Sequence, residues 1–446
     1  MEDHDMPSRE TGRDARHPTD WMGPAMQAQL RRRYRRERLF RGIGLGALLV
    51  AGLFLATLLF TIVRDGAGGF FQTEIALDVP IQEDVVGDPE SMTPSAFADR
   101  VKKANMLDLI MPALLNQFPE VETPAMQRRL RKILSRGARM EVRDFILSNP
   151  KSVGETRRLW LLASDDLDQV NKGNVDISLP ESDRPIKDLE LGWFNDLESA
   201  GQVDTRFHTL FLSTGASRDP ELAGIWGAAV GSFLTLLVTF LVAFPLGVLS
   251  AIYLEEFAPS NRITDFIEIN INNLAAVPSI VFGLLGLAVF LGTFDLPRSA
   301  PLVGGLTLSL MTLPTIIISS RAAIKAVPSS LRDAARGLGA SPMQVVFHQV
   351  VPSAMPGMLT GSIIGMAQAL GETAPLLMIG MVAFIVDVPT GITDAATALP
   401  VQIYLWADSP ERAFVEKTSA AIMVLLAFLI FMNAIAIWLR NKFETK

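Results

Sequence analysis

Cysteine is absent from this sequence of 446 residues, so it can form no disulfide and no cysteine-based zinc or redox centre. Histidine is scarce, and none of the four histidines stands near an acid and a nucleophile at a catalytic spacing. The phosphate-loop pattern G-x-x-x-x-G-K-S/T is also missing, so ATP is not bound through such a loop. The sequence therefore predicts no catalytic residue, no metal site and no cofactor, and an enzyme is its weakest interpretation.

Long hydrophobic runs, by contrast, are abundant, and 49% of the residues are hydrophobic. The runs cover residues 42–63, 225–254, 269–294, 299–320, 357–386 and 418–439. Each run exceeds the ~20 residues that a helix needs to cross a ~30 Å hydrocarbon core. We therefore predict an all-α polytopic membrane protein with six transmembrane helices.

Arginines in front of the first run indicate its orientation. Seven of residues 31–41 are arginine, with Glu37 as the opposing charge, and such clusters stay in the cytoplasm. The run is too long for a cleavable signal peptide, and no A-x-A site follows it. We expect residues 1–41 to be a cytoplasmic, largely disordered basic tail whose partner is anionic lipid, and 42–63 to be the first transmembrane helix. Nothing predicts nucleic-acid binding.

With six spans and a cytoplasmic N-terminus, the side of the membrane on which each remaining segment lies is determined. Residues 64–222 fall outside the cytoplasm, and residues 223–446 hold five spans with a cytoplasmic loop at 321–356. The positions of Arg321, Lys325 and Arg440 agree with this placement. The loop 255–268 agrees less well, because it carries four acidic residues against one arginine. The prediction is a multi-pass inner (plasma) membrane protein with both termini in the cytoplasm.

Residues 64–222, with 27 acidic and 19 basic side chains, are long enough for a domain. We call this segment the inserted domain. Thr-Pro pairs predict helices over 95–118 and 125–147, because threonine caps a helix and proline suits its first position. A third helix is expected over 152–163 and a strand over 207–212. The sequence predicts a mostly helical domain and does not indicate its function.

A polar segment at 327–352, which we call the bracket, lies between two hydrophobic runs. Ser330 and Asp333 have the spacing of a capping box, so we expect a helix from Ser330 that ends at the glycines near Gly339. Ser341 and Pro342 predict a second helix start. The small residues Ala334 and Ala335 favour docking into the groove of a protein partner over insertion into lipid. A short amphipathic hairpin on the membrane surface is the alternative.

Glu372 is the one formal charge inside a predicted span. An acidic side chain at that depth costs about 2.5–3.5 kcal/mol and is a functional candidate by default. Gln368 lies one helical turn earlier, Thr373 follows directly, and Pro375 interrupts the run. The four residues are the candidate substrate pathway or gate. The alternative is a glutamate that only ties helices together.

Three segments resemble one family, the ABC-importer permeases of the phosphate branch. DAARGLGASPMQVVFHQVVP, with Gly339 four residues after Ala335, resembles the EAA loop of ABC-importer permeases. GETAPLL at 371–377 and NLAAVPSIVFGLLGL at 273–287 resemble the phosphate permeases, PstA more closely than its sister PstC. The resemblance covers about residues 225–446, half of the chain.

The resemblance implies a permease subunit of an ATP-driven phosphate importer that has no ATPase site of its own. It implies three partners: a PstC-like second permease, a PstB-like ATPase dimer gripping the bracket, and a PstS-like periplasmic phosphate-binding protein. The sequence departs from the family at Asp333, where the motif has glutamate, at 349–352, where it has Ile-x-Leu-Pro, and at Gln368, where an arginine is expected. The inserted domain is absent from compact members.

Two other interpretations remain open. The chain could be a permease for another oxyanion, such as molybdate or sulfate, which only GETAPLL and NLAAVPSIV argue against. It could also be a membrane receptor whose inserted domain senses a ligand. The short stretch after the last predicted span disfavours that interpretation, because it leaves no room for a cytoplasmic output domain.

Overall fold

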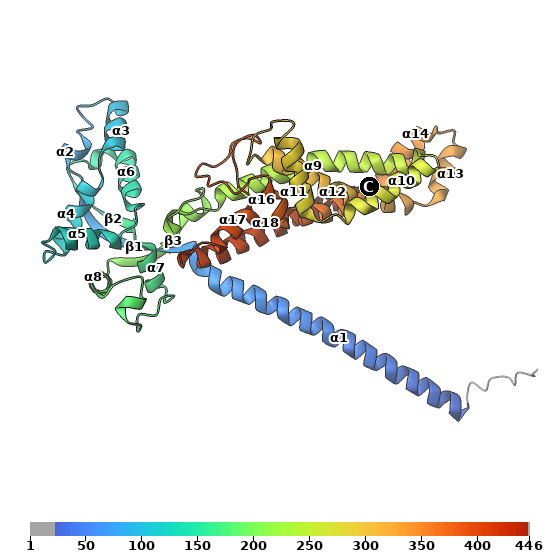
Figure 1. Ribbon diagram of the computed structural model, residues 1–446, viewed down its shortest axis with the longest axis horizontal. Coiled ribbons are helices and arrows are strands. Elements are labelled where there is room, and N and C mark those ends of the chain that lie inside the picture. The colour runs from blue at the N-terminus through green and yellow to red at the C-terminus, as the bar shows by residue number, and fades with distance from the viewer. Residues whose placement is uncertain (1–22, 445–446) are drawn as a thin grey trace, which may run out of the picture. The chain divides into compact units, whose positions relative to one another are not determined.

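A computed structural model describes residues 23–444, and the chain divides into two compact units, Met1–Thr61 and Ile62–Lys446. Helix α1 (Pro24–Gly66) contains the first predicted span and continues on its N-terminal side through the arginine cluster (Figure 1). The predicted disorder is therefore wrong for residues 24–41, because the span extends as one continuous helix. The rest of the predicted tail, residues 1–22, lies outside the described residues.

The inserted domain is built on a three-stranded antiparallel sheet in the order β2-β1-β3. The central strand β1 (Phe71–Pro80) pairs with β2 (Thr156–Leu162) and with β3 (Val203–Phe207). The register places Ile75 opposite both Leu161 and Val203. The predicted helix over 152–163 is therefore wrong, and so is the strand over 207–212. Strand β3 ends at Phe207, and residues Thr209–Leu212 form a 3-10 turn.

Helices surround this sheet and contain more residues of the inserted domain than its three strands do. They are α2 (Glu83–Val86), α3 (Pro94–Lys103), α4 (Leu107–Gln117), α5 (Pro124–Leu130), α6 (Ala138–Ser148), α7 (Asp165–Asn171) and α8 (Asp188–Ser199). The predicted threonine caps are confirmed, since Thr93 accepts from the Ala96 amide and Thr123 from the Met126 amide. Each of the two long predicted helices is split, and the buried faces of α3, α4 and α6 form one core with β1.

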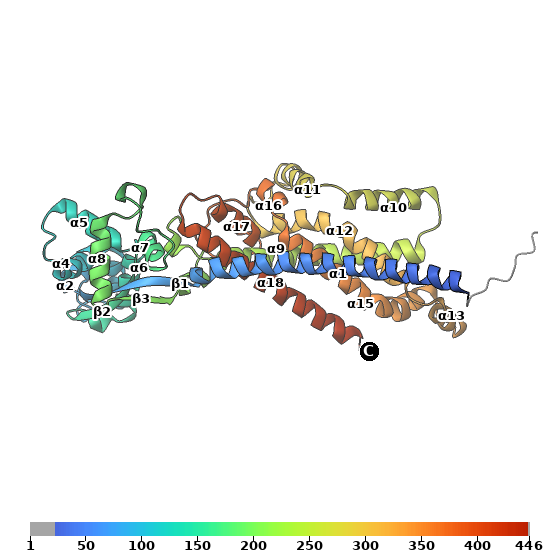
Figure 2. The same ribbon diagram turned by 90° about the horizontal axis from the view of Figure 1, so that it is seen from below.

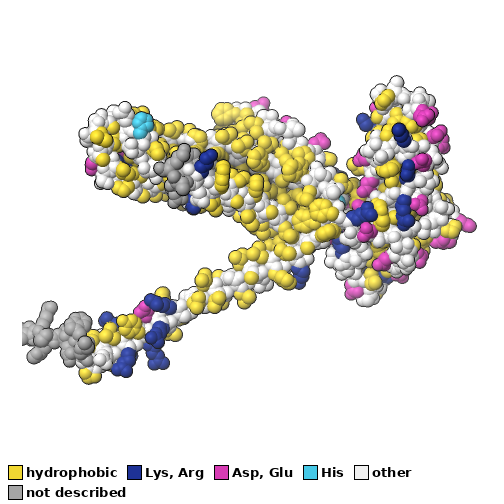
Figure 3. All heavy atoms as spheres, turned by 180° about the vertical axis from the view of Figure 1, so that it is seen from behind, with side chains coloured by type: hydrophobic (Ala, Val, Ile, Leu, Met, Phe, Trp, Pro, Cys, Tyr) yellow, Lys and Arg dark blue, Asp and Glu magenta, His cyan; other side chains and the backbone are white. Residues whose placement is uncertain are grey.

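The second half of the chain consists of helices joined by loops (Figure 2). They are α9 (Trp226–Ile252), α10 (Arg262–Ala275), α11 (Ser279–Gly286), α12 (Pro301–Lys325), α13 (Ser329–Gly337), α14 (Pro342–Val345), α15 (Val351–Gly371), α16 (Ala374–Met378), α17 (Leu399–Ala407) and α18 (Ala413–Glu444). Among the described residues, five helices are long and apolar enough to cross a membrane, or six with the bent pair α10–α11. Hydrophobic side chains cover most of the visible surface of this half (Figure 3).

Two of the five prolines in the hydrophobic runs mark breaks. The predicted span 269–294 is wrong as a straight helix, because α10 and α11 meet at 101° just before Pro278. Pro375 opens α16 after a second break, whereas Pro245 and Pro314 lie inside the continuous helices α9 and α12. Broken helices in a membrane bundle are tolerated where the freed backbone groups are buried in protein or line a cavity.

Close helix approaches hold the bundle together. A Cβ atom at Gly305 of α12 would meet the Val238 side chain of α9 at 2.5 Å, and one at Gly361 of α15 would meet Ser319 Oγ of α12 at 2.0 Å. Small residues allow such contacts in a membrane, where apolar side chains gain nothing from leaving lipid. Helix α9 begins beside the inserted domain and ends beside the bracket, so those two parts lie at opposite ends of the bundle (Figures 1 and 2).

Candidate functional site

The first bracket helix differs from its prediction at the N-terminus. Helix α13 begins at Ser329, with Pro328 at the N-cap position and no side-chain cap. The predicted capping box between Ser330 and Asp333 is therefore wrong, because Ser330 already lies inside the helix. Asp333 instead lies 3.9 Å from Arg336 Nη1, an exposed pair of little energetic weight.

The hinge and the second helix follow the prediction. Gly339 has φ +84°, the left-handed conformation that ends helices and favours glycine. Ser341 accepts from the Gln344 amide while the Gln344 side chain accepts from the Ser341 amide, with Pro342 at the first helical position. From Pro342 the chain runs through a π-helical turn into α15, as one candidate span that ends at Gly371. The second bracket helix is therefore continuous with α15.

The bracket presents an exposed apolar tip that the sequence reading missed. Leu338, between Gly337 and Gly339, is 91% exposed, and Met343 is 58% exposed. Ala334 is exposed and Ala335 is half-buried. A hydrophobic residue between two glycines at the end of a predicted helix was the available signal. An exposed tip with one large apolar side chain suits insertion into a protein groove.

Ion pairs fasten the bracket to the bundle. Arg332 donates to Glu256 at 2.8 Å and to the carbonyls of Val327 and Ile324. Arg321 donates to Glu268 at 2.6 Å and contacts Glu255 at 3.4 Å. These contacts explain the acidic loop 255–268, which fitted the orientation rule poorly. Its carboxylates neutralise Arg332 of the bracket and Arg321 at the end of α12, so the loop and the bracket lie at one end of the bundle.

Glu372 lies at a break between two helices, which corrects the prediction that it lies near the middle of one. Helix α15 ends at Gly371, Glu372 has extended backbone angles, and α16 begins two residues later with Pro375 in its first turn. Within the described part of the chain, the side chains of Glu372 and Gln368 make no hydrogen bond and no ion pair. Gln368 is exposed and Glu372 half-buried, so the break leaves two polar groups available.

Two of the three segments that carry the family resemblance, 273–287 and 371–377, meet at this break. A Cβ atom on Gly283 of α11 would lie 2.7 Å from the Pro375 Cα atom of α16. Likewise, a Cβ atom on Gly286 would lie 2.4 Å from Thr307 Oγ1 of α12. Glycine in α11 thus lets its backbone touch α16, which the sequence alone did not indicate. The contact places α11 against the helix that begins just after Glu372 and Thr373.

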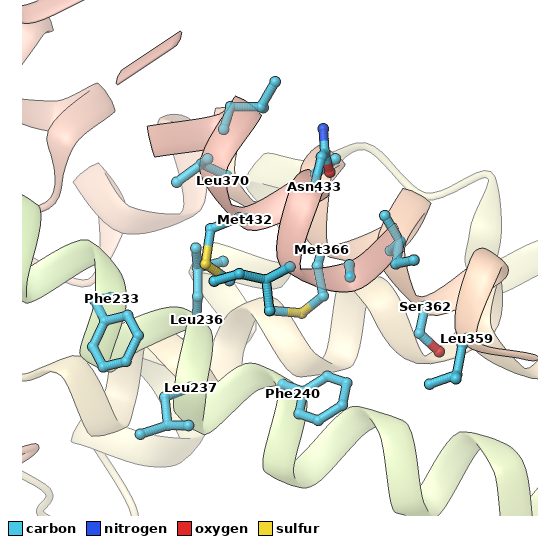
Figure 4. A pocket seen from close by; sticks show the side chains of 15 residues that line it. Phe233, Leu236, Leu237, Phe240, Leu359, Ser362, Met366, Leu370, Met432 and Asn433 are labelled. Atoms are coloured by element: carbon cyan, nitrogen blue, oxygen red, sulfur yellow. The ribbon is translucent and has the colours of Figure 1, made fainter. Parts of the chain in front are cut away.

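An apolar cavity of about 210 Å³ lies elsewhere, between α9, α15 and α18 (Figure 4). Its lining includes Phe233, Phe240, Met366 and Met432, with Ser362 and Asn433 as the polar members. No charged side chain lines it. A doubly charged anion needs several donors to replace its hydration, so this cavity does not suit an oxyanion. It suits lipid or a neighbouring helix.

Broken apolar helices around free polar groups, with an exposed helical hairpin at one end, define a membrane permease. A family model described as "Binding-protein-dependent transport system inner membrane component" matches residues 243–445. A second model, "Domain of unknown function (DUF3333)", matches residues 27–181. The chain belongs to the ABC transporter permease family and is an integral inner-membrane protein.

Several relatives carry more particular names. The "Phosphate transport system permease protein PstA" of Mycobacterium leprae is 33% identical over 227 residues, which cover 50% of this chain and 73% of the relative. "PstA 1" of Mycobacterium tuberculosis (strain H37Rv) is 30% identical over 56% of this chain and 78% of the relative. The "Probable ABC transporter permease protein YqgI" of Bacillus subtilis is 36% identical, over 37% of this chain and 56% of the relative. All three are named as permease proteins.

Among solved structures, an inward-facing form of the MetNI methionine ABC transporter matches with 19% identity and a TM-score of 0.37. The match covers 49% of this chain and 94% of that chain.

Proposed function

We propose that the protein is one permease subunit of an ATP-driven importer for inorganic phosphate, and that it forms half of the translocation pathway. The observation that carries the proposal is the similarity to PstA relatives over the transmembrane half, together with the contact between α11 and α16 beside Glu372. The bracket supports the ATP-driven part, because it is exposed and continuous with α15.

In this mechanism the bracket seats in a groove of a separate ATPase on the cytoplasmic side, with Leu338 as the anchor. Movement of the ATPase is passed through the Arg332–Glu256 pair to α9 and through the continuous chain to α15. Helix α15 ends at Glu372, so displacement of the bracket changes the break. Both termini lie in the cytoplasm, and the inserted domain (64–222) lies outside, near a phosphate-binding protein.

Glu372 acts as a gate in this proposal and not as a ligand for phosphate. A carboxylate repels a divalent anion, and at 4 Å two unit charges interact by about 4 kcal/mol when the effective dielectric constant is 20. Gln368 contributes an amide, which can donate to an oxyanion without a charge of its own. The cation that an anion pathway needs is then supplied by the second permease.

Purification from membranes tests the partners. A tagged chain is expected to bring down an ATPase and a second permease, whereas Leu338→Glu loses the ATPase and keeps the permease. Ile177→Glu, an equally apolar and 53% exposed position on the inserted domain, is the matched control and retains both. Retention of the ATPase by Leu338→Glu would contradict the docking surface.

Uptake competition tests the substrate. Labelled phosphate uptake by cells that depend on this chain is expected to fall with unlabelled phosphate and to be unaffected by equal sulfate or molybdate. Stronger competition by either of those anions would favour a permease for another oxyanion.

A further inference from the structure

The inserted domain meets the bundle at a junction built from four segments. They are the 3-10 turn Ala67–Phe70 after α1, helix α7, residues His208–Phe211, and the first two turns of α18. Helix α18 is a core element of the permease fold, and the family match includes all of it up to residue 445. The junction therefore joins the inserted domain directly to the transport half.

Lys417 of α18 is buried in this junction, with 2% of its surface exposed. Its ammonium group donates to the carbonyl of Gly69 at 3.1 Å and to Nδ1 of His208 at 2.8 Å. Burial, and then the charge of Lys417, lowers the pKa of His208 to about 3. The imidazole is therefore neutral at physiological pH and can accept through Nδ1. The amino group of Lys417 thus holds two segments of the inserted domain.

Glu416, the neighbouring residue, holds a third segment. Its carboxylate accepts from Gln169 Nε2 at 2.7 Å and pairs with Lys172 at 3.2 Å, both on α7. Lys172 also pairs with Asp168 at 2.7 Å, and Asp168 accepts from the amide and hydroxyl of Thr73 on β1. A chain of charged contacts therefore runs from α18 through α7 to the central strand.

Packing leaves the junction no room to slide. A Cβ atom on Gly66 would lie 2.7 Å from the Ser419 carbonyl carbon, and one on Gly69 would lie 2.7 Å from Ala420 Cβ. Phe211 is fully buried, and its ring packs against Phe70 and Trp406 at centroid distances of 5.4 and 6.3 Å. Backbone contact and buried aromatic rings make this a fixed joint.

The same helix leads to the candidate gate. Side chains of α18, including Phe428 and Leu429, pack against the cluster that contains Ala369 and Leu370 of α15. Those two residues precede the break at Glu372 by one turn. A displacement of α18 by the inserted domain therefore also displaces the residues at the end of α15.

We propose that Glu416 and Lys417 are positioning residues that hold the inserted domain and α18 together as one rigid body, through which docking of a loaded binding protein on the inserted domain is transmitted to the break at Glu372. The proposal rests on the importer function proposed above. Buried ion networks gain little stability over apolar packing, so a joint with so many charges indicates a need for one fixed geometry.

The test uses the full complex in proteoliposomes and measures ATP hydrolysis with and without phosphate-loaded binding protein. Lys417→Met is expected to lower the stimulation about fivefold or more and to leave basal hydrolysis unchanged. Lys102→Met, an exposed lysine on α3, is the control and behaves like the unaltered protein. If Lys417→Met does not assemble, Lys172→Met, whose side chain is 11% exposed, is expected to lower stimulation to a smaller extent.

An engineered disulfide distinguishes a role of Lys417 in transmitting the docking signal from a role in folding alone. The sequence has no native cysteine that could compete for the pairing. Gly69→Cys with Ala420→Cys places two thiols across the junction after a shift of about 1 Å. Added to Lys417→Met, the oxidised disulfide is expected to restore stimulation, and reduction to remove it again. Added to the unaltered protein, it is expected to change nothing.

Three outcomes would overturn the proposal: normal stimulation in Lys417→Met, a loss that the disulfide does not repair, or inhibition by the disulfide in the unaltered protein. Failure of the importer function itself is a separate result, because the unaltered complex would then show no stimulation by loaded binding protein.

Discussion

The inserted domain and the helical bundle solve the same packing problem by opposite means. The inserted domain buries large side chains such as Leu109, Leu114 and Trp193 around a strand. The bundle instead brings backbones together at glycines such as Gly283 and Gly305. Large interlocked side chains fill the interior of the inserted domain at the density of a soluble core, whereas glycine lets the helix backbones of the bundle approach closely in the membrane. One region is held by the burial of large side chains and the other by backbone contact.

Charge is also used differently in the two regions. The visible surface of the inserted domain carries many basic and acidic side chains, whereas the visible face of the bundle carries few (Figure 3). The pairs Arg332–Glu256 and Lys172–Glu416 mark the bracket end and the junction end. Glu372 differs from both, because it has no partner within the described residues. Paired charges fix positions, and the unpaired one is the candidate for movement.

The largest effect is expected at the unpaired charge. Glu372→Ala should reduce phosphate uptake to background and leave assembly with the partners intact, because the gate loses its only ionisable group. Glu372→Gln keeps the size of the side chain and removes its charge, so it tests the charge alone. Uptake by membrane vesicles, with complex yield as the control, measures this. Normal uptake by both variants would leave Glu372 as a helix-packing residue and would weaken the contrast between paired and unpaired charges.

Removal of a paired charge should lower the free energy of unfolding more than it lowers uptake. Arg332→Met leaves the half-buried carboxylate of Glu256 without its partner, which we expect to cost about 3 kcal/mol of unfolding free energy. Arg336→Met, at the exposed 3.9 Å pair with Asp333, should cost less than about 0.5 kcal/mol. Denaturation in detergent compares them. Equal losses would mean that the Arg332 contacts do not fasten the bracket.

Close backbone contact gives the next prediction. Gly283→Ala forces α11 away from Pro375 and should cost about 1–3 kcal/mol through overpacking, with a several-fold loss of uptake. Gly192→Ala, in helix α8 with open space around it, should be neutral or stabilising by up to about 1 kcal/mol. Melting temperature and uptake are measured together. A neutral Gly283→Ala would show that the α11–α16 contact is loose.

The smallest effect on transport is expected from a pH-dependent group in the inserted domain, where stability changes instead. Burial raises the pKa of Glu141 to about 7, and the carboxyl group accepts from the Leu162 amide at 2.9 Å. Because the folded pKa lies above the unfolded one, its stabilisation is complete below about pH 4.5 and is lost as pH rises to about 7. Glu141→Gln should therefore flatten the stability profile by at most about 1.4 kcal/mol per pH unit in this window. An unchanged slope would place the Glu141 titration outside it.

Local patterns in the sequence predicted local structure well. The hydrophobic runs gave the candidate spans, and Ser341 with Pro342 gave the second bracket helix, because both signals depend on neighbouring residues. Strand β2 was mistaken for a helix, since its partner β1 lies some 80 residues earlier, and strand formation depends on such distant pairing. The break at Glu372 was missed although Pro375 signalled it, because membrane helices often tolerate proline.

The candidate site divides in the same way. The second bracket helix could be predicted from its cap at Ser341, whereas the capping box at Ser330 was wrong and Leu338 became prominent only once its exposure was known. Lys417 was not singled out, because its partners His208 and Gly69 lie 209 and 348 residues away in the sequence. Likewise, the contact of Gly283 with Pro375 depends on a tertiary approach that no local pattern encodes.

The central claim, that the bracket carries force from an ATPase to the break at Glu372, is tested most directly at Gly339. Gly339→Asp places a charged side chain at the tip, whereas Gly201→Asp alters a glycine of similar positive φ and open surroundings on the inserted domain. The measurement is phosphate-stimulated ATP hydrolysis together with uptake in the reconstituted complex. Loss of both with Gly339→Asp and retention with Gly201→Asp is the predicted result, and normal coupling in Gly339→Asp would contradict it.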